Sequence, residues 1–494
     1  MLAAWVFRVR ARSGVGLQKM VWGFLALAAA GIAAAFRCFR VQRHALALCL
    51  LLAVFAILMF AGLLVTVGEV TDTSAVIWVR GIAWGEVGIR YEPMPRASDP
   101  PPTGPAGARG DIRVTPSQNL TGKLLLQPLE PSTRYRYTVS QNAAQISGDF
   151  VTAPGPTIAL PVRFVWSGSL GSNGHCRKPG VGYPIFGALA QVPADFFVFV
   201  GDTIYADQMC GGGARQAGYD FVARRLADFW SKHRYNREDP TVQAFFRRTS
   251  VYAIWDDREV KGSFAGPSEP LMDPGRRAFI DYFPIQPPRD EPGRLYRKFR
   301  WGALLELFIL DTRQYRSPAS MHDGPGKTML GAAQRRWLIE AVAGSSAVWK
   351  VVVSSVPLSV PTGGRVHDSW SNANAQGVPE EHGGGYALER DAILRTLRQR
   401  GVRNLVFLTG DAQHAELIRH QPAPEWSFHE LIAGPLSAAP GRPRPLDAGL
   451  NPRSLASVGG VANFGDVSIE SGGLTVRIVD AEGQVRATET IASE

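Results

Sequence analysis

The sequence has few cysteines and, near its N-terminus, no acidic residue. Only four cysteines occur in 494 residues, and the first acid is Glu69. Seven basic residues precede Glu69 and account for most of the formal net charge of +10, which leaves +3 for the rest of the chain. The net charge is therefore no argument for a nucleic-acid partner, and we expect no nucleic-acid-binding domain.

A phosphate-binding P-loop is also missing, because no Lys-Ser/Thr follows the glycine run 211–213. The chain shows no internal repeat. Its hydrophobic fraction of 45%, with 12 Trp and 24 Phe, is typical of a globular protein and excludes a disordered one. A chain of this length should form two domains or more.

An almost purely apolar run covers residues 45–67 and is long enough to cross a bilayer, which takes about 20 residues. Three arginines within 37–43 precede it, so the positive-inside rule predicts a transmembrane helix whose N-terminal end is cytoplasmic. We therefore expect a protein of the cytoplasmic membrane, with its C-terminal domains outside in the periplasm or extracellular space. Residues 21–36 are either a first span or part of a leader that begins at Met20.

Three regions follow one another along the chain. Residues 1–68 form the expected membrane region. Short alternating strands separated by turns over 69–153 predict a β-sandwich of the immunoglobulin or fibronectin kind. After a proline-bracketed linker, strands and helices alternate over 161–494, which predicts an α/β fold with parallel strand pairing.

Several apolar strands of this last region are followed directly by aspartate. The clearest is the run 197–200, after which come Gly201, Asp202 and, three residues later, Tyr205. Similar runs end at Asp256-Asp257, at Asp311 and at Asp411. Open α/β sheets build their sites at the carboxyl ends of strands, so we expect these carboxylates at one edge. Such a dense negative cluster usually needs metal cations.

The two remaining cysteines each follow a strand of this edge. Cys176 and Cys210 lie in polar, glycine-rich segments, so both are expected on the same rim. In an oxidising compartment they should pair, and we predict a disulfide between them.

The motifs resemble, in order and spacing, the alkaline phosphatase D (PhoD-like) family of metallophosphatases, which share the calcineurin-like phosphoesterase core. The resemblance holds from about residue 66 to 435. It implies a four-layer α/β/β/α core preceded by the small β-sandwich. The matching segments are Phe164–Gly168, Gly201–Asp207, Trp255–Val260, Leu310–Arg316, Leu330–Leu338, Ser354–Ser359, Asp368–Trp370 and Thr409–Asp411.

The resemblance also implies a multinuclear metal site that uses iron and calcium and hydrolyses phosphate monoesters or diesters. Asp202 matches the carboxylate that bridges the metals, and Tyr205 matches a phenolate ligand. Asp257 and Asp411 match two further ligands. Carboxylates suit calcium and a phenolate suits iron(III), so the residue types agree with the expected metals.

Three positions depart from the family pattern. Ser169 stands where the first strand usually supplies an Asp or Cys ligand, and Arg258 replaces the His of the third motif. Gln413 stands where the last motif has a His, with His414 displaced by one residue. On a strand, that shift turns the side chain to the opposite face, whereas in a loop His414 can still reach the metals and act in catalysis.

Two hypotheses follow. In the first, the protein is a membrane-anchored phosphoesterase in which Arg258 clamps the substrate phosphate in place of the acid-base His. Arg313 and Asp368 are then further substrate-binding candidates, although pairing of Arg313 with a nearby carboxylate fits equally well. In the second, the fold persists without catalysis, because Ser169 and Gln413 weaken the ligand set, and the chain serves as a binding or structural domain.

Overall fold

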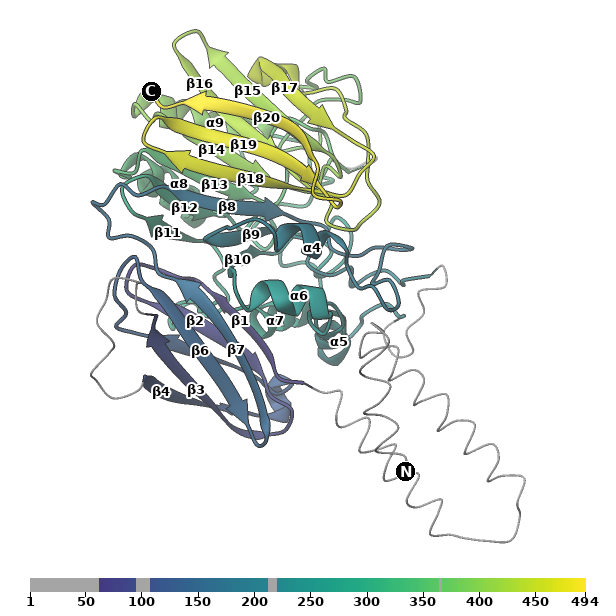
Figure 1. Cartoon of the computed structure of the whole chain (residues 1–494). Helices are drawn as coiled ribbons and strands as arrows, with labels where there is room; N and C mark the ends of the chain where they lie inside the picture. Colours follow the sequence, from purple (N-terminus) through teal and green to yellow (C-terminus); the bar gives the residue numbers. More distant parts are fainter. Residues whose placement is uncertain (1–61, 95–106, 212–219, 364–366, 382) are drawn as a thin grey trace, which may run out of the picture. The chain divides into compact units, whose positions relative to one another are not determined.

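The structure is a computed structural model that describes residues 62–94, 107–211, 220–363, 367–381 and 383–494. Residues from Leu63 to Glu494 form one compact unit. It is a mixed α/β fold with three sheets, and helices lie on the outer faces of the two larger ones (Figure 1).

The first sheet has nine strands and contains the parallel strands β8, β9 and β10. Its strands in spatial order are β20 (Val485–Ala492), β19 (Gly473–Asp480), β18 (Asn463–Glu470), β8 (Val162–Ser167), β9 (Phe196–Val200), β10 (Ser250–Ile254), β1 (Leu64–Gly68), β2 (Ala75–Arg80) and β5 (Thr121–Leu126).

The second sheet has seven strands, of which β12, β13, β14 and β16 are parallel. Its order is β11 (Arg297–Trp301), β12 (Leu305–Ile309), β13 (Trp349–Ser354), β14 (Leu405–Thr409), β16 (Trp426–Ile432), β15 (Ala415–Ala423) and β17 (Pro452–Val458). The third sheet contains β4 (Ala108–Val114), β3 (Gly85–Pro93), β6 (Arg134–Gln141) and β7 (Ala144–Val151).

The described helices lie between these strands in the sequence. They are α4 (Ile185–Leu189), α5 (Leu226–Arg237), α6 (Pro240–Phe246), α7 (Met272–Tyr282), α8 (Gly331–Ala343) and α9 (Ala387–Gln399), with short 3₁₀ turns η1 (Pro116–Gln118) and η2 (Ala448–Leu450).

Strand β9 shows why the central strands are apolar on both sides. Its side chains alternate between the two faces of the sheet. Phe197 packs on Phe245 of α6, with ring centroids 5.6 Å apart, whereas Phe196 packs on Trp301 of the second sheet at 4.7 Å. A strand covered by a helix on one face and by another sheet on the other has no polar face, which explains the unbroken run in the sequence.

The second sheet is covered in the same way. Leu307 and Ile309 of β12 belong to the core shared with the first sheet, while Phe308 between them packs in a second core with residues of α8 and α9. The two sheets therefore pack against each other, and helices cover their outer faces. This packing brings the carboxyl ends of the parallel strands of both sheets to one side.

The strands expected as a separate β-sandwich divide between two sheets. β1, β2 and β5 extend the nine-stranded sheet, because β1 pairs in parallel with β10 through Gly68 and Val251. Strands β3, β4, β6 and β7 form the four-stranded sheet. Whether residues 69–153 fold as a domain of their own stays a prediction.

The expectation of a membrane-anchored protein is wrong on the evidence of the described residues, among which no helix is both long and apolar enough to span a bilayer. The end of the apolar run that we assigned to a transmembrane helix is strand β1, Leu64–Gly68, which is buried and pairs with β2. The remainder of that run, and the segment 21–36, lie outside the described residues.

Candidate metal centre

Three aspartates meet where the two packed sheets present the carboxyl ends of their parallel strands. Asp202 follows β9, Asp256 follows β10 and Asp411 follows β14. One carboxylate oxygen of each lies within 4.8 Å of the corresponding oxygens of the other two. Oxygen ligands at this spacing, contributed by separate strands, are an arrangement suited to a hard cation.

The backbone at this edge adopts unusual conformations that aim the side chains inward. Asp202 has φ 53° and Asp411 has φ 59°, in the left-handed region that few residues other than glycine adopt. Gly201 has φ 97°, and a Cβ on it would lie 2.5 Å from the Cβ of Asp256. Backbone strain of this kind collects at functional sites and costs on the order of 1–3 kcal/mol per residue.

Burial and mutual repulsion disfavour the charged forms of these acids. Burial, followed by the nearby charges of Asp257 and Asp256, raises the pKa of Asp202 well above its usual range. Burial and the neighbouring carboxylates of Asp256 and Asp368 raise the pKa of Asp411 to about 8. Carboxylates crowded in this way ionise together near neutral pH only when a positive charge binds among them.

Tyr205 lies next to the cluster, as the sequence predicts. Its hydroxyl donates a hydrogen bond to Oδ2 of Asp202 at 3.0 Å. Burial and the charge of Asp202 raise the pKa of Tyr205 well above its usual range, so the phenol is protonated without a metal. Ser169, with φ 61°, also reaches this carboxylate, with its Oγ 3.4 Å from Asp202 Oδ2.

Of the two adjacent aspartates after β10, the one in the carboxylate cluster is not the one that we predicted as a ligand. Asp256, which we did not predict as a ligand, joins the carboxylate cluster. Asp257, which we did predict, accepts a hydrogen bond from the Ser263 N–H at 2.5 Å. Its Oδ1 is buried and has no hydrogen-bond partner among the described residues. Burial raises the pKa of Asp257 to about 6. Its Oδ1 instead lies 3.7 Å from Arg258 Nε, close enough for an ion pair, and the ligand role of Asp257 stays a prediction.

Arg313 and Asp368 are buried in a charge network behind the cluster. Arg313 Nε donates to Asp256 Oδ1 at 2.6 Å, and its Nη1 donates to Asp368 Oδ1 at 2.7 Å. Arg316 adds a third contact to Asp368 at 2.8 Å. The Arg313 side chain is 0% exposed. Both side chains are thus buried and paired with each other, and the expected substrate-binding roles of Arg313 and Asp368 stay predictions.

Arg258 lies at the edge of the cluster and is partly exposed. Its backbone N–H donates to Asp202 Oδ1 at 3.3 Å, and its Nη1 donates to Asp207 Oδ2 at 2.8 Å. Its Nε is 3.7 Å from Asp257 Oδ1. Burial acts against the charge, but Asp257, Asp202 and Asp207 together raise the pKa of Arg258 above its usual range. The guanidinium is therefore a partly accessible cation beside the cluster.

His414 and Gln413 face in different directions. Nδ1 of His414 lies 3.0 Å from the Ala412 carbonyl oxygen, and Nε2 lies 3.1 Å from Glu416 Oε2. Both ring nitrogens thus have hydrogen-bond partners inside the protein, and the expected catalytic role of His414 stays a prediction. Gln413 faces the site instead: its Nε2 donates to Ser169 Oγ at 3.1 Å, and its buried Oε1 has no hydrogen-bond partner among the described residues.

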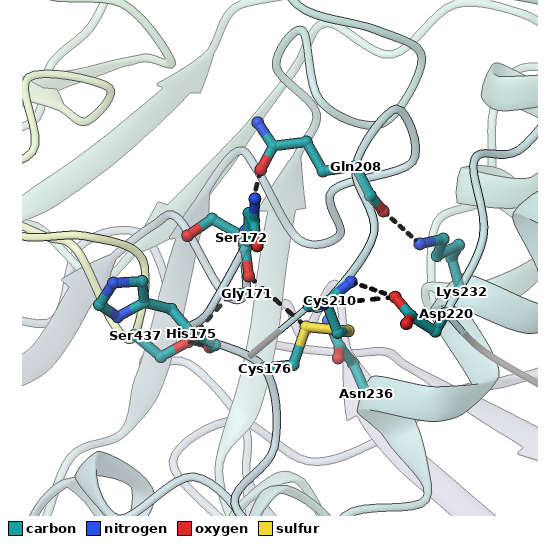
Figure 2. The surroundings of a disulfide bond; sticks show 12 residues. Gly171, Ser172, His175, Cys176, Gln208, Cys210, Asp220, Lys232, Asn236 and Ser437 are labelled. Atoms are coloured by element: carbon teal, nitrogen blue, oxygen red, sulfur yellow. Dashed lines mark hydrogen bonds between the residues drawn. A yellow bond between two sulfur atoms is a disulfide. The ribbon is translucent and has the colours of Figure 1, made fainter. Parts of the chain in front are cut away.

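A disulfide joins two loops on the rim of the site (Figure 2). Cys176 and Cys210 have Cα atoms 5.7 Å apart and enclose a chain separation of 34 residues. This closed segment contains β9, Asp202 and Tyr205. Asp220 accepts the backbone N–H of Cys210 at 2.6 Å, which fixes the second loop further.

Comparison with known proteins agrees with this geometry. The sequence model of the family described as "PhoD-like phosphatase" matches residues 171–457, more than half of the chain. The chain belongs to the PhoD-like phosphatase family. A curated relative, alkaline phosphatase D of Bacillus subtilis (strain 168), is 24% identical over an alignment of 320 residues that covers 57% of this chain and 51% of the relative. The PhoD-like chain thus spans about half the length of that relative.

Two solved structures share the fold. A structure described as "Structure of PhoD" superposes with a TM-score of 0.69 and 18% identity, over 87% of this chain and 88% of the other. Purple acid phosphatase PPD1 from yellow lupin (Lupinus luteus) seeds superposes with a TM-score of 0.59 and 13% identity, over 87% and 74%. At these identities the likeness establishes the fold alone.

The residues of this PhoD-like chain fit a bound cation. Burial and neighbouring carboxylates raise the pKa values of Asp202 and Asp411, and the buried Oε1 of Gln413 has no hydrogen-bond partner among the described residues. Every donor is an oxygen, the ligand type that hard cations prefer. Ser169 supplies a hydroxyl where the family pattern has a charged ligand, so the set holds less negative charge than the pattern.

Proposed function

We propose that this protein is a metal-dependent phosphoesterase that hydrolyses phosphate monoesters or diesters. The proposal is carried by one observation: carboxylates from the ends of three strands gather at the shared edge of two sheets in a PhoD-like chain. Asp202, Asp256 and Asp411 would hold the cation, with Tyr205 and Asp257 beside them. Carboxylate oxygens fit calcium and the phenol oxygen fits iron(III), so calcium and iron are the metals that we propose.

A bound cation in such a site neutralises phosphate oxygens and supplies hydroxide near neutral pH. The protein's own groups orient the substrate. Arg258 has its guanidinium at the accessible edge, 29% exposed, and is always protonated. It suits bidentate binding of a phosphate and cannot act as a general acid. The hydrogen bond from Arg258 Nη1 to Asp207 Oδ2 keeps the guanidinium in this position when no substrate is bound.

The test is hydrolysis of p-nitrophenyl phosphate and bis(p-nitrophenyl) phosphate by protein that has been stripped with a chelator and then reloaded with calcium and iron. We expect activity only after reloading, and loss of at least about a hundredfold in Asp411→Asn, because one cluster charge is removed. Asp195→Asn is the matched control, since Asp195 lies at the opposite end of β9 and accepts the Arg163 N–H. A reloaded wild type that hydrolyses neither ester contradicts the proposal. It would favour the alternative in which the chain keeps the fold but serves as a binding or structural domain.

A further inference from the structure

A cleft of about 620 Å³ lies beside the candidate metal centre. The segment 174–185 lines one side and residues 436–440 line the other. Ser437 connects the cleft to the centre. Its backbone N–H donates to the carbonyl oxygen of Ser169 at 3.2 Å, and its Oγ accepts the Gly171 N–H at 2.9 Å. Ser437 therefore lines the cleft and also contacts Ser169, whose side chain contacts Asp202 of the candidate metal centre.

The first wall of the cleft is held firmly at successive residues. Cys176 is fixed by the disulfide to Cys210. Arg177 Nε forms an ion pair at 3.2 Å with Asp239, whose side chain is 0% exposed. Lys178 and Gly182 exchange two backbone hydrogen bonds, at 3.0 and 2.8 Å. A cleft that is formed before a ligand arrives binds without the cost of ordering its walls.

The lining is largely apolar with a few polar side chains. Two of these, His175 and Lys178, take no part in any side-chain hydrogen bond or ion pair that the structure records within its described residues. Figure 2 shows the His175 ring directed away from the disulfide. The apolar part of the lining includes Pro179, Tyr183, Pro184, Ile185, Leu436 and Ala462. Apolar walls with a small number of free donors are typical of sites for organic ligands.

We propose that this cleft binds the alcohol portion of a phosphodiester substrate, an organic group with a broad apolar face such as an aromatic ring. The proposal rests on the proposed function, because the ester phosphate lies at the metal centre while the organic group lies past Ser437. His175 supplies a hydrogen bond to that group, and Lys178 provides a second donor at the outer end. A phosphodiester with a bulky apolar arm is then preferred over one whose arms are small.

The test is binding of two phosphinates, which carry a single negative charge and have no ester bond to hydrolyse, to the metal-loaded full chain, measured by calorimetry. We expect diphenylphosphinate to bind at least about tenfold more tightly than dimethylphosphinate, since burial of the ring is favourable. Ala462→Trp and Ala481→Trp fill the cleft from its far side and should each abolish this preference. Ala143→Trp, in the exposed turn between β6 and β7, is the control and should keep it.

Equal affinity of the wild type for both phosphinates, binding of neither, or a preference that survives both cleft-filling variants overturns the proposal. A cooperative thermal unfolding transition in each of the two tryptophan variants would show that it is folded. Because the two substitutions are at different positions, loss of the preference in both would assign the effect to the filled cleft. The outcomes separate the two proposals. If the protein hydrolyses p-nitrophenyl phosphate but binds the aromatic and methyl ligands equally, the cleft proposal is wrong and the proposed function is retained. If it prefers the aromatic ligand but hydrolyses no ester, the proposed function is wrong and ligand binding in the cleft is retained.

Discussion

Around Asp202, some side chains contact the carboxylate cluster and others support it from behind. Tyr205, Ser169 and the backbone of Arg258 reach Asp202 directly. Arg313 supports the cluster indirectly, through Asp256. Supporting groups of this kind matter for stability, because a buried charge that loses its partner is costly.

Arg313→Met should therefore destabilise the protein strongly. The change leaves Asp256 and Asp368 without the guanidinium that pairs with both of them. Loss of one partner of a buried ion pair typically costs about 3–5 kcal/mol. Urea unfolding measures this difference. The control, Arg225→Met, removes a pair with Asp228 in which the arginine side chain is 81% exposed, and should cost less than about 1 kcal/mol. Equal effects of the two changes would show that the buried network is not what stabilises the site.

Ser169→Asp should strengthen cation binding. Ser169 Oγ already lies 3.4 Å from Asp202 Oδ2, so a carboxylate at this position adds a charged ligand to the cluster. We expect the calcium affinity to rise about tenfold, because affinity for calcium increases with the number of charged ligands. Calorimetric titration measures the affinity, with Ser172→Asp in the same loop as the control. An unchanged or weaker affinity would mean that position 169 does not face the cation.

At the scale of elements, strand ends are the best-predicted feature. Runs such as 197–200 are buried on both sides, and the aspartates after three of them, Asp202, Asp256 and Asp411, meet at one edge. Asp311 does not join this cluster; its carboxylate accepts hydrogen bonds from Trp255 and Gln314. The apolar run before residue 68 is different. A buried strand and a membrane helix are equally apolar, and hydropathy does not distinguish them. The β-branched residues Val65, Thr66 and Val67 were the signal for strand β1, which pairs with β2.

The direction of individual side chains was less predictable. Asp256 and Asp257 are adjacent, and which of them turns to the cluster depends on the backbone just beyond β10. Gln413, with φ 60°, faces Ser169, while His414 turns into the protein interior. A left-handed residue changes the alternation expected of a strand, and sequence alone does not reveal where it occurs.

Removal of the disulfide tests how the rim loops are held. For a closed loop of 34 residues, loss of the bond in Cys176→Ser/Cys210→Ser should lower the free energy of unfolding by about 3–4 kcal/mol. Urea unfolding with and without reductant measures this loss. Reductant should reproduce the loss in the wild type and leave the double variant unchanged. A wild type unaffected by full reduction would show that other contacts suffice to fix these loops.

At the scale of the whole molecule, burying these acids together lowers the stability of the metal-free folded state. Burial raises the pKa values of Asp257, Glu259 and Asp411 to about 6, 7 and 8. Between about pH 4 and pH 8 these acids hold more protons in the metal-free folded state than in the unfolded state, so their contribution to stability falls as pH rises. The lowered pKa values of two histidines and three lysines act in the opposite direction; these residues are His233, His429, Lys123, Lys232 and Lys327. A cation bound among the ionised carboxylates reverses the trend due to the acids.

Thermal unfolding across pH 5 to 8.5 checks this balance. In the presence of a chelator, we expect the melting temperature to fall as pH rises through the folded-state pKa values. Added calcium should raise the melting temperature more at pH 8 than at pH 5, because protonated acids are poor ligands. A calcium effect that is the same at both pH values would contradict a cation site built from these carboxylates.

The most direct test of the candidate metal centre is the metal content of the folded chain. After incubation with calcium and iron followed by gel filtration, elemental analysis of the wild type should find at least about one ion per chain. Asp202→Asn keeps the shape and removes the charge, so it should lose the metal while its circular dichroism spectrum stays unchanged. Asp195→Asn, at the other end of β9, should retain the metal. A wild type without metal, or an Asp202→Asn variant that holds as much as the wild type, would contradict the metal centre.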